Sequence, residues 1–192
     1  KLLEAAEEAL KPLLLLAYDT GMRKGEVLNL GWAQLSLKDG VIRLSAEDTK
    51  TEQPRVICLT RRVVEALKKQ PRRLGCDYVF PNPKTGQPWN ECRKVFRRAC
   101  DKAGLSGGWF HDLRRSLVTN ARRRGVPESV VMRMSGHRTR AVFDRYDIIE
   151  EDDLRAAVKK IEAGIEDNLG HVLDTAGDPA PKKSEAPPAK CR

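Results

Sequence analysis

The chain has 192 residues, enough for one domain with a buried core, or for one domain followed by a tail. Its net charge is +9, and its longest apolar run, LLLLAY, is far too short to cross a membrane, which excludes a transmembrane segment. Up to Tyr146 there are 29 basic and 16 acidic residues, and from Asp147 onward 7 basic and 11 acidic ones. The basic part favours a polyanionic partner, nucleic acid first, although charge alone also fits a merely basic soluble protein.

The first half of the chain changes from helical to strand periodicity. A helix is predicted over residues 1 to 18, with Pro12 as a candidate interruption, then a break at DTG and a short helix in RKGEVLNL. The segment AQLSLKDGVIRLS alternates on both sides of Asp39-Gly40, which predicts a hairpin with a tight turn. RVICLT, residues 55 to 60, resembles a third strand. These segments predict a small antiparallel sheet.

The second half is predicted to be helical. The expected helices span residues 61 to 70, 90 to 103, 109 to 124, 127 to 134, 139 to 146 and 151 to 168. DPAPKKSEAPPAKCR at the end has nothing to pack and is expected to be disordered. The five cysteines are widely spaced and are interpreted as reduced thiols of an intracellular protein. The fold class is therefore α+β, mainly α with a small antiparallel sheet.

Polar side chains that can carry chemistry occur in two places. His111 and Arg114 lie one turn apart at the start of a predicted helix, where the dipole disfavours cations, so we expect an anion there. His137 follows Ser135-Gly136, and Tyr146 comes nine residues later. A straight helix would point those two side chains in opposite directions, so a bend must separate them if they meet. Each of these residues alone also has an ordinary structural interpretation.

Read together, the motifs resemble those of a known family. They are DTGMRKGEVLNL around Arg23 and Glu26, TKT around Lys50, HDLRR around His111 and Arg114, SGH around His137, and finally Tyr146. This ordered set, over roughly residues 1 to 150, resembles the catalytic domain of the tyrosine recombinases, which include phage integrases and chromosome-dimer resolvases. The resemblance implies the DNA breaking-rejoining fold of that domain.

The resemblance also implies a reaction. Six residues would surround one scissile phosphate of DNA: Arg23, Lys50, His111, Arg114, His137 and Tyr146. Tyr146 would be the nucleophile that forms a 3′-phosphotyrosyl bond, without metal or cofactor. Two guanidiniums suit the developing negative charge, and a lysine with a lowered pKa suits the departing 5′-oxygen. His111 could take the tyrosine proton and His137 could donate a hydrogen bond to the phosphate, although an imidazole can do either. Lys50 is preferred to Lys38 because it precedes RVICLT.

By the same resemblance, residues 1–148 are expected to form the catalytic domain, 149–170 a C-terminal helix that contacts a neighbouring subunit, and 171–192 a disordered tail. The expected partner is double-stranded DNA, bound by a homotetramer, with no membrane and no small-molecule substrate. We expect a cytoplasmic protein, encoded by a bacterium or a phage. Because the chain begins with Lys1, it is expected to be part of a longer protein whose N-terminal DNA-binding domain is missing.

Some positions depart from the family pattern, and other functions stay open. Ser135 stands where Leu is common and is expected to loosen the packing that aims His137, and Cys58 replaces a usual Pro. Glu26 is interpreted as a partner that orients an arginine. The acidic run 150–153 is interpreted as the first turn of a helix, in preference to a metal site. A type IB topoisomerase and a non-catalytic DNA-binding protein, such as a helix-turn-helix regulator, are the alternatives.

Overall fold

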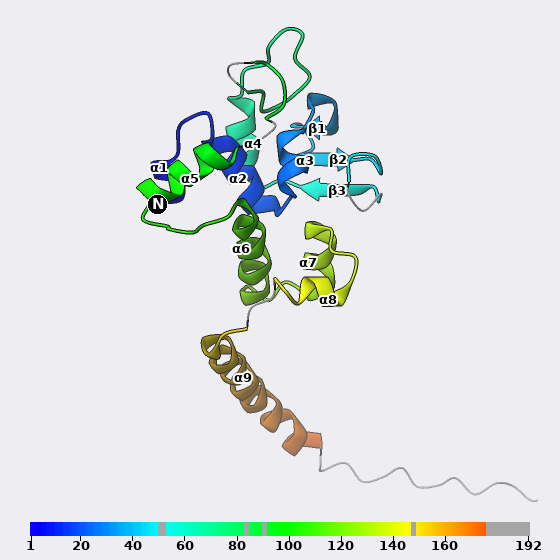
Figure 1. The fold of residues 1–192 in the computed structure, drawn as a ribbon. Helices are drawn as coiled ribbons and strands as arrows, with labels where there is room; N and C mark the ends of the chain where they lie inside the picture. The colour runs from blue at the N-terminus through cyan, green and yellow to red at the C-terminus, as the bar shows by residue number, and fades with distance from the viewer. Residues whose placement is uncertain (50–52, 83–84, 90–91, 147–148, 176–192) are drawn as a thin grey trace, which may run out of the picture. The chain divides into compact units, whose positions relative to one another are not determined.

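The computed structural model describes residues 1–49, 53–82, 85–89, 92–146 and 149–175, the last of these from residue 164 onward as backbone only. The chain divides into two units, residues 1–148 and residues 149–192. The first unit is mostly helical with a small antiparallel sheet, as predicted (Figure 1). Among the described residues, no helix combines the length and the apolar character that crossing a bilayer requires.

The N-terminal helical segment is interrupted before Pro12. The elements here are α1 (Leu2–Ala5), α2 (Lys11–Thr20) and α3 (Lys24–Leu28). Pro12 lies in the first turn of α2, where a missing N–H leaves no helical hydrogen bond unmade. The predicted break at DTG, residues 19–21, is shifted to residues 21–23, since Asp19 and Thr20 belong to α2 and Gly21 ends it with a φ of 61°. A side chain at Gly21 would come within 2.5 Å of Leu117 Cδ2, so glycine lets α6 approach the end of α2.

The predicted sheet is confirmed. It follows the 3-10 turn η1 (Trp32–Gln34) and contains β1 (Leu35–Ser36), β2 (Val41–Leu44) and β3 (Arg55–Cys58) in the order β1-β2-β3. Ser36 pairs with Val41, so residues 37–40 form the hairpin loop, and Val41 in turn pairs with Cys58. β3 ends at Cys58, before the predicted residue 60, and Thr60 is already the N-cap residue of α4.

The remaining helices agree with the predicted ones except at their ends. They are α4 (Arg61–Lys68), α5 (Arg93–Lys102), α6 (Phe110–Arg123), α7 (Glu128–Ser135), α8 (Arg140–Phe143) and, in the second unit, α9 (Glu151–Thr175). α8 ends before Tyr146, whereas the prediction carried the helix through it. α9 has its acidic residues in the first turn, as expected, and continues beyond the predicted end at residue 168, into the predicted tail.

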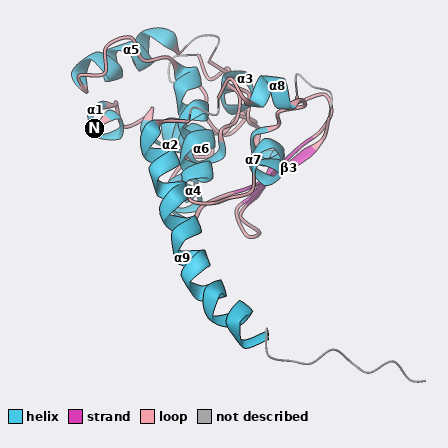
Figure 2. Cartoon of the chain, turned by 90° about the horizontal axis from the view of Figure 1, so that it is seen from below, coloured by secondary structure: helices cyan, strands magenta, loops and turns pink. Residues whose placement is uncertain are grey.

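Two hydrophobic clusters organise the first unit. The larger cluster joins α1 to α5 with the sheet and includes Leu13, Leu16 and Ile42. The smaller cluster joins α6, α7 and α8 through Val118, Ala121, Val131 and Phe143, and Tyr146 packs against it. α7 also packs beside β3, which brings the end of α7 to the sheet (Figure 2). The segment that carries His137 and Tyr146 is therefore anchored from two sides.

Candidate active site

Tyr146 lies against the two histidines that the sequence singled out. Its hydroxyl oxygen is 2.7 Å from His111 Nε2, and its ring centroid is 4.6 Å from that of His137. The predicted bend is present: residues 137–139, between α7 and α8, are not helical, and α8 is only four residues long. The Tyr146 N–H donates to the Phe143 carbonyl at 2.8 Å, in the turn that follows α8. A non-helical segment and the short α8 therefore replace the straight helix that would have separated these side chains.

The start of α6 places His111 and Arg114. Asp112 caps this helix, because its carboxylate accepts the Trp109 N–H at 2.7 Å. The same carboxylate lies in the first turn and offsets the unfavourable effect of cations at that end. Arg114 is one turn further along and is almost fully buried, with 3% of its surface exposed. A guanidinium buried to this extent needs hydrogen-bond acceptors of its own.

Two helix ends supply those acceptors. Arg114 Nη1 donates to the Gly21 carbonyl at the end of α2, at 2.7 Å, and to the Ser135 carbonyl at the end of α7. The last carbonyls of a helix have no partner within it and carry the negative end of its dipole, so they suit a buried cation. Burial, followed by the charges of Arg23 and Arg55, lowers the pKa of Arg114 to about 10. Its guanidinium carbon is 5.7 Å from the centroid of the Tyr146 ring.

Arg23 reaches the same place from the start of α3. Its Nη1 pairs with Glu26 Oε1 at 3.0 Å, and its Nη2 donates to the Gly136 carbonyl at 2.9 Å. Its backbone N–H donates to the other oxygen of Glu26 at 2.8 Å, so one carboxylate holds both ends of the residue. The interpretation of Glu26 as the partner that orients an arginine is confirmed.

Arg55 is a third guanidinium at this place, and the sequence analysis missed it. Its Nη2 pairs with Glu26 Oε2 at 2.6 Å, and its Nη1 donates to the Ser135 carbonyl at 3.0 Å. Burial lowers its pKa, and Glu26 opposes that effect. The available signal was the register of β3: Arg55 shares a strand face with Ile57, which is buried, so a charged residue stands at an inward position.

Three guanidiniums thus converge on the end of α7, and we call Arg23, Arg55 and Arg114 the arginine cluster. Its members donate hydrogen bonds to the carbonyls of Ser135 and Gly136, and the carboxylate of Glu26 bridges two of the three arginines. Three positive charges against this carboxylate leave the cluster positive. An anion bound beside Tyr146 would offset that charge.

His137 is buried between this cluster and the smaller hydrophobic cluster. Its Nδ1 lies 2.7 Å from the Ser135 hydroxyl oxygen, and its buried Nε2 has no hydrogen-bond partner among the described residues. Burial, followed by the charges of Arg114 and Arg23, lowers the pKa of His137 to about 3, so its ring is neutral near pH 7. The expectation that Ser135 loosens the setting of His137 is wrong, because the serine hydroxyl contacts the ring directly.

His111 is more open to solvent than His137. Burial, followed by the charge of Arg114, lowers its pKa as well. A neutral imidazole 2.7 Å from a phenol can accept the phenolic proton. The structure therefore brings together Arg23, His111, Arg114, His137 and Tyr146. Lys50 lies outside the described residues.

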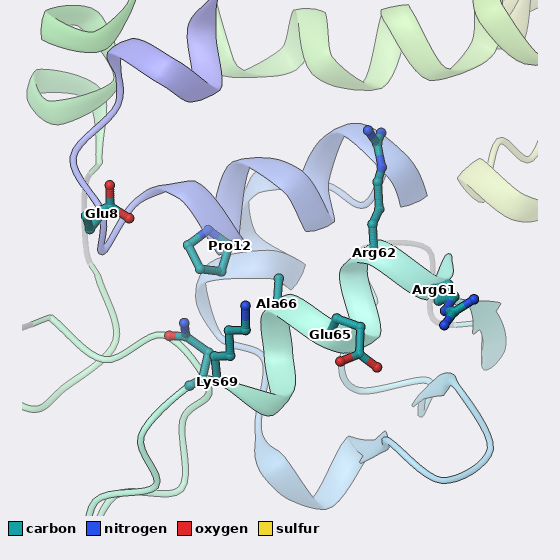
Figure 3. Close-up of a pocket in the computed structure, with 8 residues that line it drawn as sticks. Glu8, Pro12, Arg61, Arg62, Glu65, Ala66 and Lys69 are labelled. Atoms are coloured by element: carbon teal, nitrogen blue, oxygen red, sulfur yellow. The ribbon is translucent and has the colours of Figure 1, made fainter.

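One hollow borders this site, and another lies elsewhere on the first unit. One of about 580 Å³ is lined by Arg23, Lys24, Glu26 and His111 among others, so two of the site residues border open space. A larger hollow of about 680 Å³ lies between α4 and the segment that leads into α2 (Figure 3). Its lining residues carry charges of both signs, and none of them belongs to the cluster around Tyr146.

Comparisons with known proteins agree with this arrangement. The model of the phage integrase family matches residues 1–151. The integrase of Salmonella phage P22 is 26% identical over 177 residues, which cover 85% of this chain and 45% of that protein. The crystal structure of XerA recombinase superposes with a TM-score of 0.72 at 21% identity, covering 83% of this chain and 61% of that one. XerH site-specific recombinase, in a post-cleavage complex with its palindromic difH substrate, gives a TM-score of 0.68 at 22% identity, covering 84% and 50%. The chain thus spans less than half the length of the P22 relative.

Proposed function

The chain belongs to the phage integrase family, and we propose that it is the catalytic part of a site-specific DNA recombinase that cleaves and rejoins DNA through a 3′-phosphotyrosyl intermediate. Arg23, Lys50, His111, Arg114, His137 and Tyr146 are proposed as its site residues. The observation that supports this most directly is the Tyr146 hydroxyl, 2.7 Å from His111 Nε2 and beside the positively charged arginine cluster.

In the proposed first step, the Tyr146 oxygen attacks the scissile phosphorus and its proton passes to His111 Nε2. The bond from phosphorus to the 5′-oxygen breaks, and that oxygen leaves as a hydroxyl with a proton from Lys50. Arg23 and Arg114 neutralise the negative charge that develops on the nonbridging oxygens. In the second step, a 5′-hydroxyl of another strand attacks the phosphotyrosine, releases Tyr146 and restores a phosphodiester. The bond energy is conserved, so the chemistry needs no nucleotide or metal.

We propose double-stranded DNA as the partner. The basic surplus up to Tyr146 supports this, since a phosphate backbone attracts dispersed Arg and Lys. The similar structure of XerH site-specific recombinase, which is bound to its palindromic difH substrate, supports it too. Tyr146 packs on the hydrophobic cluster of its own chain, which favours attack within the same subunit.

The experiment that tests the activity traps the covalent intermediate. The chain is mixed with nicked duplexes tiled across the DNA that flanks its gene, so that the short 5′-hydroxyl strand is lost after cleavage. We expect an SDS-resistant protein–DNA adduct in the wild type and none with Tyr146→Phe. Tyr18→Phe is the matched control: Tyr18 is a partly exposed tyrosine whose hydroxyl accepts a hydrogen bond from Asn120, it is not one of the proposed site residues, and the variant should form the adduct normally.

Three outcomes would contradict the proposal. An adduct that persists in Tyr146→Phe would show that another group is the nucleophile. A wild-type chain that binds these duplexes in a gel shift and forms no adduct on any of them would instead be a non-catalytic DNA-binding protein. Relaxation of supercoiled plasmid without strand exchange would indicate the topoisomerase alternative.

We further propose that α9 joins neighbouring subunits of a homotetramer on DNA. Its exposed apolar side chains Leu154, Val158 and Ile161 recur at helical spacing and form one stripe. A chain cut after residue 148 should still bind DNA but form smaller complexes than the full chain in analytical ultracentrifugation. Complexes of equal size would remove α9 from the interface.

A further inference from the structure

The hydroxyl of Ser135 lies between a helix carbonyl and the ring of His137. Ser135 is fully buried. Its Oγ is 2.7 Å from the carbonyl oxygen of Val131 and 2.7 Å from Nδ1 of His137, with a longer contact of 3.3 Å to the carbonyl oxygen of Met132. Two short contacts therefore compete for the one proton that a serine hydroxyl has.

The chemistry of the partners decides where that proton goes. A carbonyl oxygen only accepts, so the 2.7 Å contact to Val131 needs the hydroxyl proton, in the usual bond from a helical serine to the carbonyl four residues earlier. The 2.7 Å contact to the ring must then be made by a proton on Nδ1. We propose that Ser135 holds neutral His137 as the Nδ1–H tautomer, which leaves Nε2 as an unprotonated acceptor in the free protein.

The groups around His137 keep its ring neutral. The open question is therefore which of the two ring nitrogens carries the proton. Arg114 and His111 face it from α6, Arg55 from β3 and Arg23 from the start of α3. The ring of Tyr146 packs on it at 4.6 Å between centroids, and Phe143 contacts it edge-on at 5.6 Å. Cations on several sides and burial oppose a charge on the imidazole, in agreement with its lowered pKa.

The tautomer assignment has a consequence for the role of His137 in catalysis. Only this consequence rests on the proposed function. Nε2 is buried and has no partner among the described residues, so its lone pair is available to take up a proton. A phosphate that binds near the arginine cluster offsets the positive charges that disfavour a charged ring. His137 would then gain a proton on Nε2 as DNA binds, and only in that state would it donate a hydrogen bond to the phosphate. Ser135 acts here as a positioning residue.

The test reads the tautomer directly. In the full chain without DNA, labelled with ¹⁵N-histidine, long-range ¹H–¹⁵N correlation spectra show which ring nitrogen carries the proton, and the signal missing in His137→Gln identifies His137. We expect the Nδ1–H form in the wild type and mainly the Nε2–H form in Ser135→Ala. The Nε2–H form in the wild type, or an unchanged tautomer in Ser135→Ala, would overturn the proposal.

Ser116→Ala is the matched control. Ser116 makes the same bond to the carbonyl four residues earlier, at 2.8 Å to Asp112 in α6, and we expect its loss to leave the His137 tautomer unchanged. A change in Ser116→Ala equal to that in Ser135→Ala would mean that any loosened helix has this effect, which would also overturn the proposal. Because the spectra need no DNA, they stay decisive even if no covalent adduct forms. Where adducts do form, Ser135→Ala should shift the pH profile of their formation, and Ser116→Ala should not.

Discussion

Glu26 determines how two of the guanidiniums in the site are held. Its carboxylate is buried and pairs with Arg23 and Arg55, which come from different elements. In a buried arrangement, removing one partner leaves the remaining charges without compensation, which typically costs about 3 to 5 kcal/mol. The residue is therefore a structural requirement for the arginine cluster.

We predict that Glu26→Gln lowers the free energy of unfolding by about 3 kcal/mol, because Arg55 stays buried without its ion pair. Urea unfolding followed by circular dichroism measures this. Glu65→Gln serves as the control: Glu65 pairs with Lys68 at 3.0 Å on the surface of α4, where solvent screens the interaction, and its loss should leave stability nearly unchanged. Equal effects of the two substitutions would mean that the buried carboxylate is not what holds the cluster together.

At the scale of elements, the end of α7 is the point on which the site depends. The carbonyls of Ser135 and Gly136 accept from three guanidiniums, and the turn at Gly136 directs the chain toward His137. A Cβ at Gly136 would lie 1.7 Å from Arg55 Nη1, and the backbone there has a φ of 73°. Both the close approach and the conformation therefore require glycine.

Gly136→Ala should destabilise the fold by clearly more than the roughly 1 kcal/mol expected from a left-handed backbone alone. Gly125→Ala isolates that backbone contribution, because Gly125 has a φ of 78° and nothing within 4 Å of the added carbon. Thermal unfolding of both variants gives the comparison. If the two melting temperatures fall by the same amount, Arg55 moves aside at no cost and the close approach does not matter.

The same elements show what the sequence could predict. Local patterns were enough for the hairpin around Asp39-Gly40 and for the start of α6, because periodicity and turn residues act within a few positions. The bend before Tyr146 was inferred because a straight helix could not bring it to His137. Arg55 was missed because its role depends on packing between β3 and α7, and Ser135 was misread because its hydroxyl acts on a ring two residues away. The register of β3 marks Arg55 as inward, but only its tertiary contacts show that it joins the site, and the Ser135 contact depends on the left-handed turn at Gly136.

At the scale of the whole molecule, the excess of positive charge lies in the part of the chain that carries the proposed phosphate site. The basic surplus up to Tyr146 and the acidic surplus after it differ in sign, and the arginine cluster contains Arg114, the one Arg or Lys side chain that is buried among the described residues. Two histidines with lowered pKa values lie beside this cluster. The stability of the free chain should therefore depend on pH in a range set by those histidines.

The sign follows from the pKa values. Unfolded, His137 has a pKa near 6.5, whereas in the folded chain its pKa is about 3, so below about pH 6.5 the unfolded state binds more protons. Stability should be full above that pH and fall by about 1.4 kcal/mol per pH unit toward pH 4 from His137 alone, with His111 adding to the slope. Urea unfolding at pH 6.5, 5.5 and 4.5 measures it. His137→Gln should reduce the slope of the free energy of unfolding against pH by the contribution of one proton, about 1.4 kcal/mol per pH unit. This holds whatever the effect of the substitution on stability at pH 6.5. An unchanged slope would mean that His137 is already charged in the folded chain, and the lone pair assigned to its Nε2 would not exist.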